Sequence, residues 1–597
     1  MSSGYILGIS RGHNAGVCLL KDGKIVFASE EERFSRHKYD GSPLATMLKV
    51  KEYTDKIDAL VICHTTGLKD APKIEYTGDN MYAGLARKLD LIDRKADLYN
   101  HPQVIDVSHL HHKVHAACAF YRSGFDDAVA VVIDGAGSAT QGQTHEGPVI
   151  LWEVESIYDC SYPDNIKTLY KHYGCRDPII TVINKNTSAE QFGEEGTFTS
   201  VVSGHAGITK VYEAVTQYLG FQAIEAGKTM GLFPYGEENI KIPKLFNTDS
   251  KIPLSNRSLI VPTYPNAAFV NHLNYEELAS TETSVENLPT LKNRKDLAYA
   301  CQIETQDQAL DLILTASKLT GKKKVVLSGG YGLNCVANYH YLTRLNKEGI
   351  ELFVEPISND GGTAIGAALM YYHSVTQSEM RRPREIYLGP QYNYTDEEIN
   401  SLAEEYNGIV SDATDEDVVN LMTEKNIVAM FQGRAENGPR ALGNRSLMFD
   451  PTFEDGKDFV NEIKRREFFR PFAGSILAED AHEWFDLRGM PDSPHMMYAV
   501  NCQEGVAEKI PSIIHVDGTC RIQTVAEEEN PLYYRVIKAF KEKTGIPIIF
   551  NTSFNLGGEP LVETLEDALW TLSESRIEYL YLPEYGKLIT VGNWKIA

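Results

Sequence analysis

The feature that most constrains the fold of this chain is a pattern of strand, polar turn and strand that occurs twice. The apolar runs expected to form these strands are residues 6–10 and 16–20 in the first copy, and residues 128–133 and 148–152 in the second. A further apolar run at 24–28 follows Asp22-Gly23, a dipeptide typical of a two-residue hairpin turn. The repeated pattern predicts two related halves in the N-terminal part of the chain.

Strands and helices alternate further along the sequence. Residues 324–328 form a buried-strand pattern that ends in Gly329-Gly330, and Asp360 precedes a helix-like run at 361–369. Alternation of this kind predicts an α/β fold. Two strand–turn–strand units suggest two ribonuclease-H-like halves that face each other across a cleft, which is the plan of actin and the sugar kinases. Many α/β proteins repeat such units, so periodicity favours this plan without excluding others.

The length of the chain and one charged segment predict its domain organisation. At about 150 residues per domain, 597 residues allow up to about four domains. Residues 379–385 combine charge with proline, and Gly389-Pro390 lies just beyond them, which is typical of a linker. We therefore expect an N-terminal domain at 1–380 and a C-terminal domain at 386–597. The second domain is also expected to be α/β, and it opens with the helix-capping pattern Thr395-Asp-Glu-Glu398.

Net charge and cysteine spacing exclude several classes of protein. The 58 basic and 82 acidic residues give a net charge of −24, which argues against an extended polyanion-binding surface and leaves a local basic pocket open. Nine scattered cysteines without a CxxC motif fit neither a disulfide scaffold nor a zinc ribbon, and they favour a reducing compartment. The N-terminus lacks a basic region, and no apolar run approaches the ~18 residues that span a bilayer. We expect a cytoplasmic protein with no membrane partner.

A histidine-rich segment at 109–115 offers metal ligands. If this segment is helical, His111 and His115 lie one turn apart on the same face, where two imidazoles can bind one ion. His112 stands where HExxH metalloproteases have their glutamate, so a metalloprotease would lack its general base. Asp360 at a strand-to-helix turn is a third candidate ligand, and two histidines plus one carboxylate suit Fe²⁺ or another divalent ion. A solvated or helix-capping histidine cluster is the alternative.

Three glycine turns suggest a nucleotide-binding cleft. They are Asp134-Gly135, Ser328-Gly329-Gly330 and Asp360-Gly361-Gly362. Glycine lets the backbone approach a phosphate closely, and helix N-termini supply N–H donors. A single Gly-Gly pair is most often a plain turn, but three such turns beside apolar strands or helices favour a nucleotide site. Lys228 also lies beside glycines, although its surroundings are not a Walker A sequence.

Basic residues are concentrated beside glycines and small polar residues in the C-terminal domain. These cations are Arg440, Arg445, Lys464, Arg470 and Arg521. Serine and asparagine donors occur at 551–555. Forked guanidinium groups together with such donors suit a small oxyanion, for example a phosphate ester. The alternative for any one of these cations is a surface salt bridge.

In this order the motifs resemble the O-carbamoyltransferases of the nodulation, cephamycin and aminoglycoside pathways, the NodU/CmcH/TobZ family, nearly from end to end. In the N-terminal half, the family signatures correspond to residues 12–16, 31–34, 111–120, 134–135, 228–232, 328–338 and 360. In the C-terminal half, they correspond to residues 433–446, 464–472, 515–523 and 550–560. Asn14 and Gly16 depart from the usual pair in the first signature.

The resemblance implies two domains with separate activities. The N-terminal domain is similar to the threonylcarbamoyl transferase of tRNA modification, an actin-like (ASKHA) fold that binds a metal and a nucleotide. The C-terminal domain is similar to YrdC. In such enzymes the C-terminal site uses carbamoyl phosphate and ATP, with Mg²⁺, to form carbamoyl-adenylate. An acceptor hydroxyl then attacks the carbonyl of this adenylate at the N-terminal site.

The resemblance also implies roles for individual residues. His111, His115 and Asp360 would be metal ligands, and Asp360 would also be catalytic. His13, for which a plain turn histidine is the alternative, would contact the acceptor or assist its deprotonation. The expected nucleotide contacts of the N-terminal site are Asp134, Gly135, Lys228, Gly329, Gly330 and Asn334. The expected carbamoyl phosphate contacts are Arg440, Lys464, Arg470, Arg521, Asn551 and Ser553, of which Lys464 and Arg521 would be catalytic.

The sequence does not determine the acceptor. Relatives carbamoylate sugars, antibiotics, toxins and nodulation factors, and a hydroxymethylated pyrimidine nucleotide is chemically feasible. The stretches 66–100 and 161–196 resemble the family least and are expected to shape the acceptor pocket. A threonylcarbamoyl transferase acting on tRNA is an alternative that the net charge disfavours. An actin-like kinase is another, and it would not need the arginine-rich domain. The oligomeric state, including a homodimer, stays open.

Overall fold

The computed structural model divides the chain into two compact units. The first unit contains residues 1–31 and 39–385, and the second contains residues 32–38 and 386–597. Residues 32–38 were assigned to the N-terminal domain from the sequence, but their contacts place them in the second unit. The structure describes residues 4–64, 82–96, 101–144, 147–175, 182–203, 207–240, 242, 245–246, 292–381 and 384–592. Much of the stretch 66–100 and a few residues of 161–196 lie outside these ranges.

The first sheet of the first unit contains the predicted hairpin and its neighbours. Its strands are β1 (Tyr5–Ser10), β2 (Gly16–Lys21), β3 (Lys24–Glu30), β4 (Ala59–Cys63) and β5 (Val104–Asp106), in the order β3-β2-β1-β4-β5. The β1–β2 and β2–β3 pairs are antiparallel, whereas β1–β4 and β4–β5 are parallel. Asp22 and Gly23 connect β2 to β3 with positive φ values, as the hairpin turn requires.

The second sheet repeats this arrangement and extends it. Its strands are β6 (Asp127–Ile133), β7 (Ala139–Thr144), β8 (Gly147–Ser161), β9 (Asn165–Gly174), β10 (Val182–Ser188), β11 (Thr197–Ser203), β12 (Lys324–Ser328) and β13 (Glu351–Val354). The series β9-β8-β6-β12-β13 has the same order and the same antiparallel and parallel pairs as the first sheet. This repeat supports the two related halves predicted from the sequence, and the predicted α/β class is confirmed.

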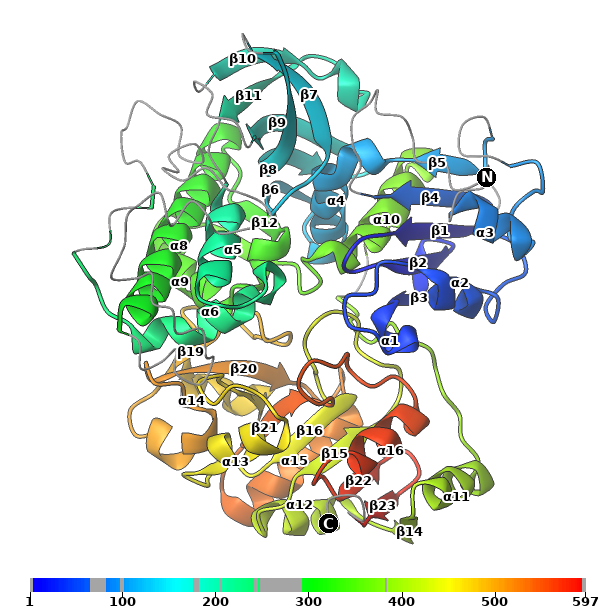
Figure 1. The fold of residues 1–597 in the computed structure, drawn as a ribbon, viewed down its shortest axis with the longest axis vertical. Coiled ribbons are helices and arrows are strands. Elements are labelled where there is room, and N and C mark those ends of the chain that lie inside the picture. The colour runs from blue at the N-terminus through cyan, green and yellow to red at the C-terminus, as the bar shows by residue number, and fades with distance from the viewer. Residues whose placement is uncertain are drawn as a thin grey trace. The chain divides into compact units, whose positions relative to one another are not determined.

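Two helices lie between these sheets in the first unit (Figure 1). Helix α4 (His111–Ser123) packs on β6 and β12, α10 (Thr363–Thr376) packs on β1 and β2, and the two helices pack on each other. A Cβ atom on Gly366 would lie 2.1 Å from the carbonyl oxygen of Val114, so glycine is needed where α10 approaches α4. This close contact brings the start of α4 beside the turn that precedes α10.

Further helices cover the outer faces of the first unit. They are α2 (Leu44–Val50), α3 (Ala83–Lys88), α5 (Ile208–Tyr218), α6 (Ala226–Leu232), α8 (Lys292–Thr320) and α9 (Cys335–Lys347). Helix α8 packs on α5, α6 and β6. Among the described residues, no helix is both long and apolar enough to cross a membrane.

The second unit is built on one mixed sheet in the order β14-β23-β22-β15-β16-β21-β17-β20-β19-β18. The strands are β14 (Gly408–Asp412), β15 (Val428–Phe431), β16 (Arg445–Phe449), β17 (Ala473–Leu477), β18 (Phe485–Asp486), β19 (Ala499–Cys502), β20 (Thr519–Val525), β21 (Ile548–Ser553), β22 (Tyr579–Leu582) and β23 (Lys587–Val591). The helices are α1 (Glu32–Ser35), α11 (Asp396–Glu405), α12 (Asp415–Thr423), α13 (Gly456–Ile463), α14 (Ala481–Trp484), α15 (Pro531–Thr544) and α16 (Leu565–Ser573). The predicted cap of α11 is present, because Thr395 accepts a hydrogen bond from the Glu398 amide at 3.2 Å.

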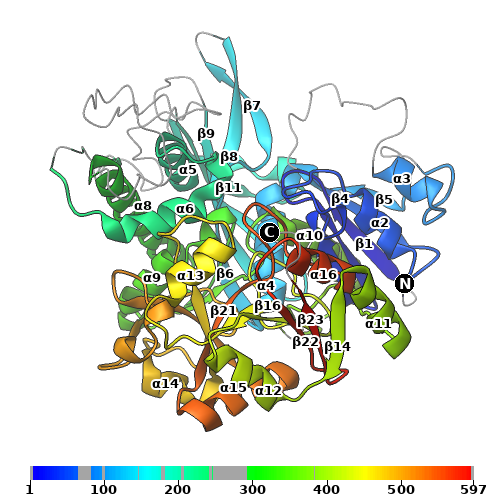
Figure 2. The ribbon, with the colours of Figure 1, turned by 60° about the horizontal axis from the view of Figure 1, so that its bottom comes forward.

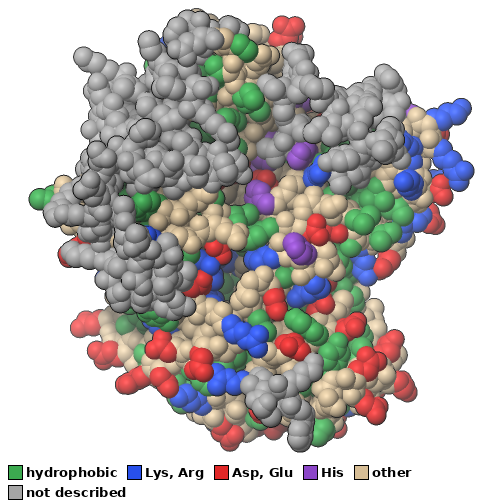
Figure 3. Space-filling view, viewed as in Figure 1, with side chains coloured by type: hydrophobic (Ala, Val, Ile, Leu, Met, Phe, Trp, Pro, Cys, Tyr) green, Lys and Arg blue, Asp and Glu red, His purple; other side chains and the backbone are tan. Residues whose placement is uncertain are grey.

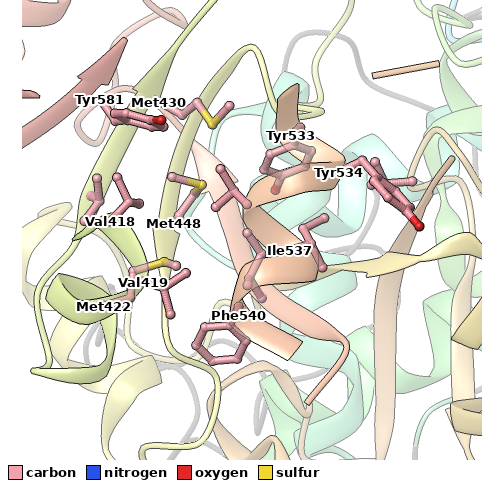
Figure 4. Packing of buried hydrophobic residues seen from close by; sticks show 14 of the residues in the cluster. Val418, Val419, Met422, Met430, Met448, Tyr533, Tyr534, Ile537, Phe540 and Tyr581 are labelled. Atoms are coloured by element: carbon pink, nitrogen blue, oxygen red, sulfur yellow. The ribbon is translucent and has the colours of Figure 1, made fainter. Parts of the chain in front are cut away.

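The core of the second unit lies between this sheet and the helices α12 and α15, which pack side by side (Figure 2). Ile537 and Phe540 of α15 pack with Met422 of α12 and with Met430 and Met448 of the sheet (Figure 4). All five side chains are fully buried. Flexible methionines fill the irregular gaps between the aromatic rings and the β-branched residues of this cluster.

Truncating Phe540 should therefore destabilise the second unit. We expect Phe540→Ala to lower its free energy of unfolding by about 3–5 kcal/mol, because the substitution removes buried apolar contacts and leaves a cavity. Urea unfolding followed by circular dichroism measures this change. The control is Ile409→Ala, since Ile409 is 72% exposed and its truncation should cost no more than about 0.5 kcal/mol. Equal losses in the two variants would contradict the assigned core.

Candidate functional site

The predicted histidine pair lies at the start of α4, in the first unit. His111 and His115 are one turn apart and both are buried. Their Nε2 atoms are 3.2 Å apart, and the two rings meet at 84°. The helical geometry therefore places both imidazoles on the same face and points them at the same position.

Two carboxylates complete this cluster. Oδ1 of Asp360, in the turn before α10, lies 3.4 Å from Nε2 of both histidines. Oδ2 of Asp134, directly after β6, lies 3.6 Å from Nε2 of His111. One ligand atom from each of the four residues lies within 4.8 Å of the other three. The sequence analysis selected His111, His115 and Asp360 as ligands, and it placed Asp134 at a nucleotide turn instead.

The charges and hydrogen bonds of these residues fit a divalent cation. Burial opposes ionisation of Asp360 and of Asp134. His111 nevertheless holds the pKa of each of these two carboxyl groups below the ordinary value of an aspartate. Burial also opposes protonation of His111, yet Asp360 and Asp134 raise its pKa to about 10. Nδ1 of His111 is buried and has no hydrogen-bond partner among the described residues. Two imidazoles and two carboxylates form a donor set that suits Fe²⁺ or Mn²⁺.

The predicted nucleotide turns follow β6 and β12. The Gly330 amide donates a hydrogen bond of 3.0 Å to Oδ1 of Asp134, so the two turns lie together at the ends of adjacent parallel strands. Gly329 has a φ of +89°, and a Cβ atom there would lie 2.3 Å from the carbonyl oxygen of Ile133. A Cβ atom on Gly135 would lie 2.4 Å from Oε1 of Glu213, so α5 borders the same turn. The sequence analysis did not identify Glu213.

Two of the residues predicted to contact a nucleotide, Lys228 and Asn334, make local interactions in the structure. Nζ of Lys228 lies 2.7 Å from Oε1 of Glu225 on the preceding turn. The side chain of Asn334 caps α9 by accepting a hydrogen bond from the Ala337 amide at 3.1 Å, and it also bonds to Gln302. His13 is exposed in the turn after β1, and its Nδ1 lies 4.0 Å from Oδ2 of Asp360. His13 is therefore at the edge of the cluster formed by His111, His115, Asp134 and Asp360.

The predicted oxyanion residues of the second unit lie on β20 and β21, the two strands that flank β17, and on the loops beside these strands. Arg521 of β20 and Asn551 of β21 are both register partners of Ala473 in β17, so they flank the same position. Nδ2 of Asn551 donates a hydrogen bond of 3.2 Å to the carbonyl oxygen of Ala441, which ties the sheet to the loop that carries Arg440.

Lys464 organises the loop after β21. Its Nζ donates to the carbonyl oxygen of Ser553, and also to the carbonyl oxygen and Oδ1 of Asn555 at 2.9 and 3.1 Å. Burial, together with the cations Arg466 and Arg470, holds the pKa of Lys464 well below its ordinary value. Lys464 is thus a buried cation whose donors are directed at the backbone of the loop that carries Ser553.

Two arginines beside Lys464 have unsatisfied donors. The Nε atoms of Arg466 and Arg521 are buried and have no hydrogen-bond partner among the described residues. Burial and the charges of Arg470 and Arg521 lower the pKa of Arg466. Arg470 lies 3.4 Å from Glu467. Nη2 of Arg466 donates to the carbonyl oxygen of Pro471 at 3.2 Å, so only part of its guanidinium group is satisfied. Buried cations that repel one another and keep unsatisfied N–H groups favour an anion as ligand. The sequence analysis included Arg466 in a basic run but did not select it.

Figure 3 shows the charges on one face of the described residues. On the face shown in Figure 3, acidic and basic side chains are intermixed, as expected from the net charge of −24. A net charge of −24 disfavours an extended polyanion-binding surface, so the cations of the second unit suit a small anion better than a polyanion.

Comparisons with known proteins agree with the resemblance in the sequence. Residues 75–369 match the family described as carbamoyltransferase N-terminus, and residues 419–587 match carbamoyltransferase C-terminus. The chain is 30% identical over 602 residues to nodulation protein NolNO of Sinorhizobium fredii. The aligned region covers 96% of this chain and 78% of that protein. It is also 32% identical over 245 residues to the 3'-hydroxymethylcephem-O-carbamoyltransferase of Amycolatopsis lactamdurans. This aligned region covers 40% of this chain and 44% of that enzyme.

Among solved structures, full-length HypF in its phosphate- and nucleotide-bound form matches with a TM-score of 0.36 and 15% identity, over 64% of this chain and 48% of that one. A likeness at this level carries no conclusion about function. The two family matches together include most of the chain, and the similarity to NolNO extends over nearly all of it. This chain belongs to the carbamoyltransferase family of enzymes.

Proposed function

We propose that the protein is an O-carbamoyltransferase that forms carbamoyl-adenylate in its second unit and transfers the carbamoyl group to an acceptor hydroxyl in its first unit. The observation that carries this proposal is the group of buried cations in the second unit, in which the Nε atoms of Arg466 and Arg521 have no hydrogen-bond partner among the described residues. A carbamoyl donor and an acceptor follow from the family. Carbamoyl phosphate with ATP is the donor pair whose charge suits these cations.

The proposed reaction in the second unit has two steps. Water first cleaves carbamoyl phosphate to carbamate and phosphate. A carbamate oxygen then attacks the α-phosphorus of ATP, accompanied by Mg²⁺, and pyrophosphate leaves. Arg440, Arg470 and Arg521 would neutralise the phosphate oxygens, Asn551 and Ser553 would donate hydrogen bonds, and Lys464 would hold the loop in place. This chemistry needs no protein nucleophile, because charge stabilisation alone lowers the barrier.

The proposed reaction in the first unit is attack of the acceptor oxygen on the carbonyl carbon, with loss of AMP. His13 would accept the proton of the acceptor hydroxyl, since a neutral imidazole is a suitable base near pH 7. Backbone N–H groups at Gly135, Gly329 and Gly330 would bind phosphate oxygens. His111, His115, Asp134 and Asp360 would hold a divalent ion such as Fe²⁺. When bound, such an ion supplies Lewis-acid stabilisation of oxygen charge.

The proposal extends to the folds that the resemblance implies. The repeated sheet order supports an actin-like (ASKHA) plan for the first unit, and the second would be YrdC-like. Lys228 and Asn334 would contribute to nucleotide binding through the elements that they stabilise, α6 and α9. The acceptor would be a small-molecule natural product, a sugar or a hydroxymethylated nucleotide.

The proposal is tested by the products formed from ATP. We expect release of AMP and pyrophosphate that depends on carbamoyl phosphate, and mass spectrometry of candidate alcohols should detect an added carbamoyl group. Reactions without carbamoyl phosphate, and reactions without ATP, are the controls. Formation of ADP and a phosphorylated alcohol, independent of carbamoyl phosphate, would instead identify a kinase. Carbamoylation of tRNA alone would identify the other alternative.

A further inference from the structure

The loop between β6 and β7, residues 134–138, carries the cluster residue Asp134 and is held along β8. The amides of Asp134 and Gly137 both donate to backbone carbonyl oxygens of β8, at 3.1 and 2.8 Å. The amide of Ser138 donates to a side chain instead, because it bonds to Oε2 of Glu153 at 3.0 Å. A Cβ atom on Gly137 would lie 2.7 Å from the same carboxylate oxygen, so Glu153 fits closely against the loop. Glu153 therefore fixes the loop in which Asp134 lies.

Ser138 joins this loop to the start of α4. Its Oγ accepts a hydrogen bond of 3.2 Å from the amide of His111, the first residue of the helix, and donates to the carbonyl oxygen of Ser108 at 2.9 Å. The first amides of a helix have no partner within the helix, and Leu110, which precedes α4, supplies no side-chain cap. Ser138 supplies that cap from another segment, so it holds the backbone of His111 next to the loop of Asp134.

Glu153 forms a buried ion pair with Lys171 of β9. Both side chains are only 1% exposed, and Nζ of Lys171 donates to Oε1 of Glu153 and to the phenol oxygen of Tyr158, the latter at 2.9 Å. Nζ of Lys171 also lies 4.5 Å from the ring centroid of Phe192. Burial opposes ionisation of Glu153, but the charge of Lys171 lowers the pKa of Glu153 to about 2. The carboxylate therefore stays charged and accepts strongly from the amide of Ser138.

The next pair along the same two strands supports α5, the helix that borders the turn after β6. Nδ1 of His172 lies 2.5 Å from Oε2 of Glu155, and Oε1 of Glu155 accepts a hydrogen bond of 2.8 Å from the amide of Ile208, the first residue of α5. Lys171 and His172 belong to the stretch 161–196, which the sequence analysis associated with the acceptor. Their side chains contact the supports of the loop and of α5.

We propose that Ser138 and Glu153 are positioning residues for the cluster of two histidines and two aspartates, and that Lys171 holds Glu153 in place. His111 lies on α4 and Asp134 on the loop after β6, so the distance between these two ligands depends on the bonds that join the two segments. Groups that are held in place before a ligand binds lose less conformational entropy when it does. This inference rests on the proposed function for the presence of a divalent ion, and its readout is ion affinity instead of carbamoylation.

The first experiment measures the affinity of the full chain for Mn²⁺ by electron paramagnetic resonance, without ATP. The Mn²⁺ site that is lost in His111→Ala identifies the cluster. At this site we expect Ser138→Ala to weaken Mn²⁺ binding about 10- to 100-fold, as the loss of a hydrogen-bond partner of the ligands does in other metal sites. Ser138→Thr keeps the hydroxyl group and should retain most of the affinity.

Ser123→Ala is the matched control for Ser138→Ala. Ser123 is also buried, and its Oγ donates to the carbonyl oxygen of Phe120 at 2.8 Å and accepts from the amide of Phe125 at 3.0 Å. The control thus removes the same pair of hydrogen bonds at the opposite end of α4, and it should leave the affinity for Mn²⁺ unchanged. Equal affinity in Ser138→Ala, Ser123→Ala and the unsubstituted protein would overturn the proposal.

The second experiment tests Glu153 and Lys171 in pairs of substitutions, because either single substitution leaves an uncompensated buried charge. Glu153→Gln with Lys171→Met removes both charges but keeps a side-chain oxygen that can accept from the amide of Ser138, so it should retain most of the affinity for Mn²⁺. Glu153→Leu with Lys171→Met removes the acceptor as well and should weaken Mn²⁺ binding by about the same factor as Ser138→Ala. Equal affinity in the two double variants would show that Glu153 does not position the loop.

These outcomes also distinguish this inference from the proposed function. If Ser138→Ala loses affinity for Mn²⁺ but the unsubstituted protein carbamoylates no acceptor, the positioning role is supported and the proposed function fails. If an acceptor is carbamoylated but Ser138→Ala binds Mn²⁺ normally, the proposed function is supported and the positioning role is wrong. Melting temperatures of Ser138→Ala within a few degrees of Ser123→Ala show that the loss does not come from unfolding.

Discussion

His111→Ala is expected to abolish carbamoylation of the acceptor while ATP-dependent adenylate formation continues. His111 Nε2 lies 3.2–3.6 Å from the nearest atoms of His115, Asp360 and Asp134, so its removal takes away the ligand at the centre of the cluster. Loss of an outer-shell partner alone costs about 10- to 100-fold in metal affinity or activity, and loss of a direct ligand should cost more. We therefore expect a decrease of more than about 100-fold in transfer.

The measurements are metal content by elemental analysis and the rates of both half-reactions. His109→Ala is the matched control, since it removes an exposed imidazole just before the same helix. Chelation should reproduce the loss of transfer, and adding Fe²⁺ or Mn²⁺ back should restore it, whereas Mg²⁺ should restore only the use of ATP. A metal-free His111→Ala protein that forms product at the normal rate would show that the histidine cluster is structural.

Arg521→Ala should abolish the use of carbamoyl phosphate and leave transfer from supplied carbamoyl-adenylate intact. The buried Nε of Arg521 has no partner among the described residues, so this N–H group is available to an oxyanion. Removing one donor that stabilises an oxyanion costs about 2.7–4 kcal/mol, or a factor of about 10²–10³ in rate. Carbamoyl phosphate-dependent pyrophosphate release measures this loss.

Arg535→Ala is the control for Arg521→Ala. Arg535 lies in the same unit, its side chain is 51% exposed, and it pairs with Asp415 on the surface. The control should retain both half-reactions, since an exposed ion pair contributes little to stability. If Arg521→Ala stays folded and also fails to transfer from carbamoyl-adenylate, the assignment of two separate sites is wrong.

Lys464 is less suitable than Arg521 for this test. The sequence suggested that both residues bind carbamoyl phosphate, but Nζ of Lys464 donates to Ser553 and Asn555. Lys464→Ala would remove the donor to these part-buried acceptors and would release the loop that carries Ser553. A loss of activity in that variant would therefore not separate binding from loop structure.

Local sequence patterns determined much of the fold. The hairpin β2–β3 was predictable because Asp22-Gly23 can adopt the positive φ values that a two-residue turn needs. The strand β6 was predictable because continuous apolar runs mark strands buried on both faces. The four-residue spacing of His111 and His115 determined that they share a helix face, since that spacing is close to one turn. These features depend on neighbouring residues alone.

Only the tertiary structure decided how distant segments combine. Asp134 joins the histidine cluster because β6 and β12 are adjacent and α4 packs on both, and no local pattern contains that information. Residues 32–38 belong to the second unit although they lie near the start of the chain, because Arg33 and Arg36 donate hydrogen bonds to carbonyl oxygens on loops of that unit. Sequence order assigned that segment to the N-terminal domain. Hydrogen bonds between residues hundreds of positions apart form only once both partners are folded, so the sequence determined the local elements and tertiary packing determined the composition of each site.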